Sequence, residues 1–141
     1  MPDDPDLRGV YERIIDGVSA DDAGVLEGLV AADLIDHNPV PGQPSGREGF
    51  ISWMHGMHAA FPDMTGAIED TVVEGGRIAG RVLWTGTHQG EFLGLPGTGR
   101  RISITAMHLV RFEGGMAAEW WGAADLLGAA MSLDARLEPP R

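Results

Sequence analysis

One histidine interrupts an apolar series in the C-terminal third of the chain. His108 follows Ile102, Ile104 and Ala106 at two-residue spacing, and Val110 continues the series. This spacing places side chains on one face of a β-strand. A histidine on such a face is either a hydrogen-bonded core residue or a residue that faces a cavity. His108 is therefore our first candidate for acid/base chemistry, and both readings stay open.

Asp125 is the candidate carboxylate partner of His108. Gly114-Gly115 indicates a tight hairpin before it. A two-residue turn pairs His108 with Trp121 and puts Asp125 on the same face. One extra residue in a bulge puts Trp120 and Gly122 there instead. Asp125 also precedes an apolar run and is a suitable helix N-cap, so catalysis and capping both remain possible.

The other candidates for contact with a substrate are aromatic or polar side chains. Tryptophans that line a cavity suit a flat aromatic or polyene ligand, although an ordinary core or interface is the commoner place for any one of them. An asparagine can hydrogen-bond a carbonyl or enolate oxygen, and it is also typical of turns. The candidate substrate-binding residues are Asn38, His37, Trp53, His55, Trp84, His88, Trp120 and Trp121.

Composition excludes or disfavours several other classes of function. The chain has 141 residues, no cysteine and a formal net charge of -11. Disulfide and thiolate chemistry are therefore impossible, and the scattered arginines disfavour nucleic-acid binding. His55 and His58 lack further ligands nearby, so we expect no metal. Without a signal-like start or a membrane-length apolar run, we expect a cytoplasmic protein.

Helical spacing precedes strand spacing along the chain, which predicts an α+β fold. We expect a single domain over residues 1–141, with its core at about 7–132. Ser45 and Glu48 form a capping-box pattern at the start of the third helix. The predicted helices are 7–18, 22–29 and 46–61, the stretch from 34 to 38 is extended, and the predicted antiparallel strands are 67–73, 77–88, 101–112 and 117–124.

Several sequence blocks together resemble the SnoaL-like polyketide cyclase (ester cyclase) family of the nuclear-transport-factor-like superfamily. These blocks are Ala60–Met64, Ile68–Asp70, Gly86–Pro96, Thr98–Arg100 and Glu119–Gly128. The resemblance implies a cone-shaped, curved antiparallel β-sheet wrapped by N-terminal helices, with a pocket inside. It also implies intramolecular aldol ring closure of a small apolar or aromatic polyketide ester in secondary metabolism such as antibiotic biosynthesis, without metal or cofactor.

The resemblance also assigns residues. His108 matches a histidine that neighbours the family's acid/base aspartate, but Gly122 stands where that aspartate is expected, and Asp125 matches a second aspartate. Similar proteins hydrolyse epoxides, isomerise ketosteroids or assist hydroxylation. A related enzyme of that kind, or a non-catalytic binding domain, therefore remains an alternative to a cyclase. The mixed strand face of Ser103, Thr105, Met107 and Leu109 predicts a homodimer or higher homo-oligomer.

Overall fold

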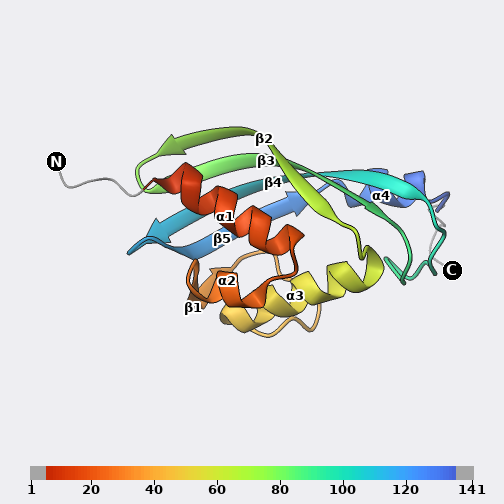
Figure 1. Cartoon of the computed structure of the whole chain (residues 1–141), viewed down its shortest axis with the longest axis horizontal. Coiled ribbons are helices and arrows are strands. Elements are labelled where there is room, and N and C mark those ends of the chain that lie inside the picture. Colours follow the sequence, from red (N-terminus) through yellow and green to blue (C-terminus); the bar gives the residue numbers. More distant parts are fainter. Residues whose placement is uncertain (1–5, 136–141) are drawn as a thin grey trace, which may run out of the picture.

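The computed structural model describes residues 6–135, in which helices come first and strands dominate the second half (Figure 1). The elements are α1 (Leu7–Ser19), α2 (Ala23–Glu27), β1 (Val30–Asp36), α3 (Gly46–Ala60), β2 (Thr65–Glu74), β3 (Arg77–Thr87), β4 (Arg101–Glu113), β5 (Met116–Ala124) and α4 (Leu126–Ser132). The α+β class is confirmed, as are the four strands expected after residue 64. Among the described residues, no helix is long and apolar enough to cross a membrane.

The five strands form one curved sheet in the order β1-β5-β4-β3-β2. Antiparallel pairing joins β2 to β3, β3 to β4 and β4 to β5. The two hairpins turn at Gly75-Gly76 and Gly114-Gly115, and all four glycines have positive φ. That conformation is required at both centres of a type I′ turn, whose twist matches the flanking strands.

The expectation of antiparallel pairing throughout the sheet was wrong at one edge. Residues 30–36 form the complete strand β1, which pairs in parallel with β5 through Val30↔Ala117 and Asp36↔Trp120. The second helix is correspondingly shorter than expected and ends at Glu27. A long connection through α3 and three strands separates β1 from β5, so no hairpin forces the two strands to run in opposite directions.

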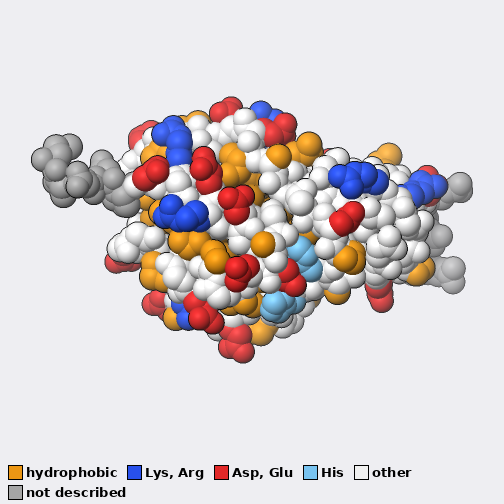
Figure 2. All heavy atoms as spheres, in the orientation of Figure 1, with side chains coloured by type: hydrophobic (Ala, Val, Ile, Leu, Met, Phe, Trp, Pro, Cys, Tyr) orange, Lys and Arg blue, Asp and Glu red, His pale blue; other side chains and the backbone are white. Residues whose placement is uncertain are grey.

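Helices α1, α2 and α3 lie on one face of the sheet and leave the other face open, and α4 packs against β4 at the end of the sheet (Figure 1). Along β4, residues 102, 104 and 106 are buried, while residues 103, 105 and 107 are exposed. The buried residues of α1 include Val10, Tyr11, Ile14, Ile15 and Val18, and they follow the expected helical spacing. On the molecular face drawn in Figure 2, the arginines are scattered among acidic side chains and form no continuous basic surface.

The capping box predicted at the start of α3 was wrong, because its side-chain hydrogen bond does not form. Ser45 is the N-cap residue, but its side chain makes no capping hydrogen bond. Gly46, the first helical residue, has φ +76°, and a Cβ there would lie 2.5 Å from the carbonyl oxygen of Ala32. The close approach of β1 to the start of α3 therefore imposes a glycine and an irregular first turn, which the box geometry cannot accommodate.

Gly46→Ala should destabilise the fold, because it adds both backbone strain and a clash with β1. We expect a loss of about 1–3 kcal/mol in the free energy of unfolding. Gly56→Ala in the same helix is the matched control, since a Cβ there meets nothing within 4 Å. The control should gain about 0.5–1 kcal/mol. Urea unfolding of both variants measures the difference, and equal stabilities would contradict this account of Gly46.

The homodimer stays a prediction, and the open sheet face is where we expect it to form. Met107 is 52% exposed there, next to the partly buried Leu109. Met107→Glu would place a charge beside the apolar Leu109 in such an interface, so it should convert a dimer to a monomer. Light scattering at micromolar concentration measures the mass. A wild-type monomer would reject the prediction.

Candidate active site

A cavity of about 520 Å³ lies between the inner face of the sheet and the helices. This volume is in the range of pockets that enclose small organic ligands. Its walls are mainly apolar, and the polar side chains that line it are Asp36, Asn38, Gln43 and His108. Among the described lining residues there is no arginine, so the pocket favours a neutral, largely apolar ligand over an acidic one.

His108 meets its partner inside the core. The hydroxyl of Tyr11, on α1, lies 2.7 Å from Nδ1 of His108, on β4. Tyr11 is fully buried. Gly80, on β3, pairs directly with His108 in the sheet, and a Cβ on Gly80 would collide with the tyrosine ring. The glycine therefore gives the tyrosine ring space to reach across the sheet to the histidine.

The direction of this hydrogen bond follows from burial. Among the described residues, the Tyr11 hydroxyl has His108 Nδ1 as its only partner. A buried hydroxyl that did not donate its proton would cost about 1–3 kcal/mol. Tyr11 therefore donates to Nδ1, and the proton of the neutral imidazole is on Nε2.

Burial also keeps both partners of this pair uncharged. It lowers the pKa of His108 to about 4 and raises the pKa of Tyr11 well above its usual range. His108 is accordingly neutral near pH 7. With its proton on Nε2, it is a hydrogen-bond donor and not a strong base.

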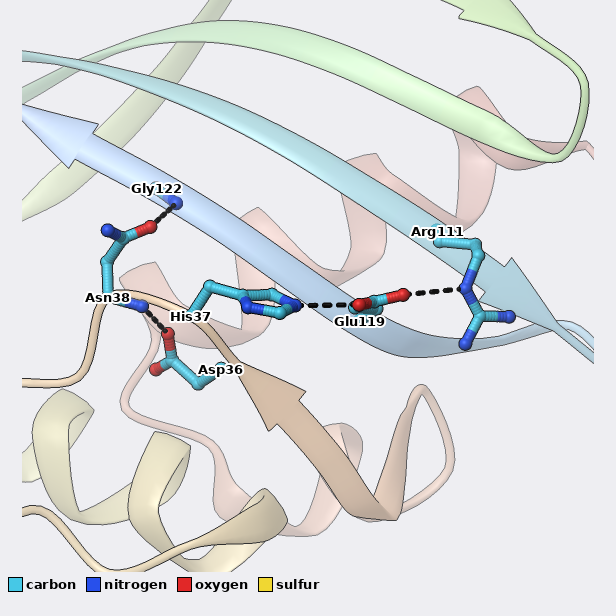
Figure 3. Close-up of polar contacts among 6 residues, drawn as sticks. All are labelled: Asp36, His37, Asn38, Arg111, Glu119 and Gly122. Atoms are coloured by element: carbon cyan, nitrogen blue, oxygen red, sulfur yellow. Dashed lines mark hydrogen bonds and ion pairs between the residues drawn. The ribbon is translucent and has the colours of Figure 1, made fainter.

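Asn38 is held between β1 and β5 by contacts at both ends of the residue (Figure 3). Its Oδ1 accepts the Gly122 N–H at 3.0 Å, and its own backbone N–H donates to Asp36 Oδ1 at 3.0 Å. Gln43 donates to the other oxygen of Asp36 at 2.9 Å. Among the described residues, the Asn38 amide N–H₂ has no acceptor. It is therefore free to donate to a ligand at the pocket wall.

The β4–β5 hairpin contains the bulge that was one of the two expected alternatives. The register shifts between Arg111 and Phe112, so His108 pairs with Gly122 and Val110 pairs with Trp120. Trp120 therefore lies beside His108, with ring centroids 4.9 Å apart. A Cβ at Gly122 would lie 3.2 Å from the Trp120 indole nitrogen and 3.3 Å from His108 Cδ2. Because residue 122 is a glycine, the space between these two rings holds no side chain.

Five of the ten expected residues line the pocket, and the other five do not. Those in the lining are Asn38, Trp53, Trp84, His108 and Trp120.

Two of the residues outside the lining lie on the open face of the sheet. His37 stacks on Trp121 with ring centroids 4.4 Å apart. His37 also contacts Glu119 at 2.6 Å, and Arg111 donates to the same carboxylate (Figure 3). These contacts hold the end of β1 against β5 on the outer face of the sheet. The same segment of the chain carries Asp36 and Asn38, which line the pocket.

The remaining three residues have local partners. His88 is fully buried and its Nδ1 contacts Thr98, which closes the base of the loop after β3. His55 contacts Asp21 at the surface. Asp125 is exposed and accepts the Gly128 N–H at 2.8 Å as the N-cap of α4. The structure thus gives Asp125 the capping role that the sequence allowed.

Sequence reasoning missed Tyr11, Asp36 and Gln43. Tyr11 is the only tyrosine, on the apolar face of α1, and a buried hydroxyl there requires a partner. Asp36 stands two residues before Asn38, a spacing that puts both on the same side of an extended segment. No sequence pattern indicates Gln43, which reaches Asp36 only because the loop turns back.

His108, which is part-buried at the pocket wall and desolvated there, should make stability depend on pH. The unfolded chain, with an ordinary histidine pKa of 6.5, binds a proton that folded His108 does not accept until about pH 4. The contribution of neutral His108 to the free energy of unfolding is fully present above about pH 6.5. It is lost as the pH falls toward about 4, and the loss is at most about 3 kcal/mol. His108→Gln should lose this component. Urea unfolding of both proteins at several pH values checks it, and identical slopes would contradict the assignment.

Comparison with known proteins agrees with this architecture. A family model described as SnoaL-like polyketide cyclase matches residues 8–133. No curated protein matches the chain. Within the described residues, no cluster of three or more histidine or acidic side chains forms a metal-type site.

Three similar solved structures come from Streptomyces species. TsrD from Streptomyces laurentii has a TM-score of 0.85 and 26% identity, covering 92% of this chain and 96% of TsrD. IdmH from Streptomyces antibioticus, a proposed polyketide cyclase, has a TM-score of 0.82 and 30% identity, covering 92% and 99%. AclR from Streptomyces galilaeus, a proposed hydroxylase, has a TM-score of 0.78 and 25% identity, covering 90% and 94%. With a family match over most of its length and the same curved-sheet fold, the chain belongs to the SnoaL-like polyketide cyclase family, on the nuclear-transport-factor-like fold.

Proposed function

We propose that this protein binds a small, largely apolar or aromatic carbonyl compound and catalyses proton transfer beside the carbonyl, as in the aldol ring closure of a polyketide ester. The observation that carries this proposal is the hydrogen bond from Tyr11 to His108. It fixes a neutral imidazole as a donor at the wall of an apolar cavity. A donor of that kind stabilises the negative charge that develops on a carbonyl oxygen during enolisation.

Two further donors support the same role. The Asn38 amide belongs to the side chain that already holds Gly122. The Trp120 indole N–H lies next to the empty side-chain position of Gly122, and among the described residues it donates to no acceptor. His108 Nε2–H, the Asn38 amide and the Trp120 N–H thus belong to neighbouring residues. A carbonyl oxygen bound among them would be favoured more strongly as it becomes an enolate.

Asp36 is the proposed base, because it is the carboxylate among the described lining residues of the pocket. Its two oxygens accept hydrogen bonds from Asn38 and Gln43, which fix its orientation. In the sheet it pairs with Trp120, beside the donors. Asp125 is not proposed as the base, since its carboxylate caps α4 and is not part of the pocket lining.

The proposed reaction balances without a redox partner. Asp36 removes the proton from the carbon next to the bound carbonyl, and the electron pair of that C–H bond moves toward the carbonyl oxygen. The enolate carbon then forms a bond to a second carbonyl carbon of the same molecule. Protonated Asp36, directly or through water, returns the proton to the new alkoxide. The product is an isomer of the substrate, so the chemistry is pure acid/base catalysis.

A hydroxylation-type reaction is the second candidate function. Gly122 removes the carboxylate that the resemblance places opposite His108, and the similar AclR is a proposed hydroxylase. Product mass separates the two candidates, because ring closure leaves the mass unchanged and hydroxylation adds one oxygen atom.

Enolisation is testable without the natural substrate. Hydrogen–deuterium exchange beside the carbonyl of 2-tetralone, a neutral aromatic ketone, is followed by NMR in D₂O. Asp36→Asn should slow enzyme-catalysed exchange by about 100-fold or more, because the base is lost. His108→Gln should slow it as well, because the oxyanion loses a donor.

Asp125→Asn is the matched control, since asparagine also caps a helix well. It should retain both exchange and melting temperature. If exchange survives in Asp36→Asn but disappears in Asp125→Asn, the base is Asp125 and not Asp36. No acceleration by the wild-type protein, despite binding of the ketone measured by calorimetry, would indicate a binding protein.

A further inference from the structure

The pocket wall on the side away from Asn38 is built around Trp84. Gly66 on β2, Trp84 on β3 and Ile104 on β4 lie side by side in register on the inner face. Asn38 is bonded to Gly122 on β5, two strands from β3. Because neighbouring strands are about 4.8 Å apart, a ligand anchored at Asn38 extends roughly 10 Å across the sheet before it reaches the strand of Trp84.

A second, much smaller void lies against the same tryptophan. It measures about 10 Å³ and is bordered by Phe61, Gly86 and Ile102. Met57, Met64, Trp84 and Ile104 line both this void and the main pocket. The void has the size of about one water molecule, and its lining is apolar except for Thr85, whose hydroxyl contacts Thr65. It therefore suits an apolar group better than water. Trp84 therefore borders both the main pocket and this small apolar space.

The position of the indole depends on the residue beneath it. A Cβ on Gly66 would lie 2.7 Å from Cζ3 and 2.9 Å from Cη2 of Trp84. The six-membered ring thus packs directly over the backbone of β2, at a distance that only glycine permits. Any side chain at position 66 would push the ring away from β2, toward the interior of the pocket.

We propose that Trp84, seated on Gly66, is a specificity-determining residue that sets the maximum length of the ligand. The inference rests on the proposed function only in taking this pocket as the ligand site, and it requires no catalytic role of Asp36 or His108. Removing the indole joins the main pocket to the void and admits a longer ligand. Displacing the indole inward shortens the ligand that fits.

A homologous series of 4′-alkylacetophenones, from methyl to octyl, tests this by calorimetry. In the wild-type protein, affinity should rise by about fourfold per buried methylene until the chain meets Trp84, and then fall. Trp84→Leu should move this cut-off to longer chains, and Gly66→Ala should move it to shorter ones. Gly56→Ala, whose Cβ meets nothing within 4 Å, should leave the cut-off unchanged.

A parallel series of n-alkylbenzenes separates this inference from the proposed chemistry, because these compounds lack the carbonyl. If Trp84→Leu moves the cut-off to longer chains and Gly66→Ala moves it to shorter chains in both series, the role of Trp84 is supported even if no ketone is enolised. The same cut-off in the wild-type protein, Trp84→Leu and Gly66→Ala overturns it, as does the failure of both series to bind the wild-type protein. If Trp84→Leu does not fold, Trp84→Phe with a verified melting temperature takes its place and should give a smaller shift in the same direction.

Discussion

The hydrogen bond between Tyr11 and His108 is the contact on which the chemistry of this pocket depends. It joins two residues that are 97 positions apart in the sequence, one on the first helix and one in the middle of the sheet. Each partner would be an unsatisfied polar group in the core without the other, at a cost of about 1–3 kcal/mol. The bond therefore supports the packing of α1 on the sheet and at the same time determines which imidazole nitrogen carries the proton.

Two glycines shape the surroundings of His108. Gly80 leaves the space through which the tyrosine ring reaches the histidine, and Gly122 leaves the space between His108 and Trp120 free of a side chain. A carboxylate on β5 at position 122 would have occupied that space. In its absence, His108, Trp120 and Asn38 present neutral donors there, and the carboxylate among the described lining residues is Asp36, on β1. The fold of the family is thus retained, while the proposed base comes from β1 and not from the position on β5 that the resemblance indicates.

The sequence predicted the elements well because their signals are local. The helical spacing of α1 and the Gly-Gly turns of both hairpins depend on neighbouring residues only. The parallel pairing of β1 with β5 was missed because it is a long-range contact with no turn to indicate it.

The site was harder to predict, since a shift of one residue reverses a strand face. The bulge at Arg111–Phe112 turns Trp120 into the pocket and leaves Trp121 outside against His37. His108 was found by its place in an apolar series, whereas Tyr11 was not, because a helical residue gives no local sign of a partner so distant in the chain. Asp125 remained ambiguous until its contact with the Gly128 N–H assigned it to the helix cap.

The tautomer and charge of His108 test the central claim most directly. Long-range ¹H–¹⁵N NMR spectra of the uniformly ¹⁵N-labelled protein distinguish a protonated from an unprotonated ring nitrogen, and His108→Gln assigns the signals. The account predicts a neutral ring with its proton on Nε2 and a bare Nδ1, unchanged from neutral pH down to near the lowered pKa of about 4. A proton on Nδ1, or an imidazolium already formed near pH 6.5, the ordinary histidine value, would contradict it.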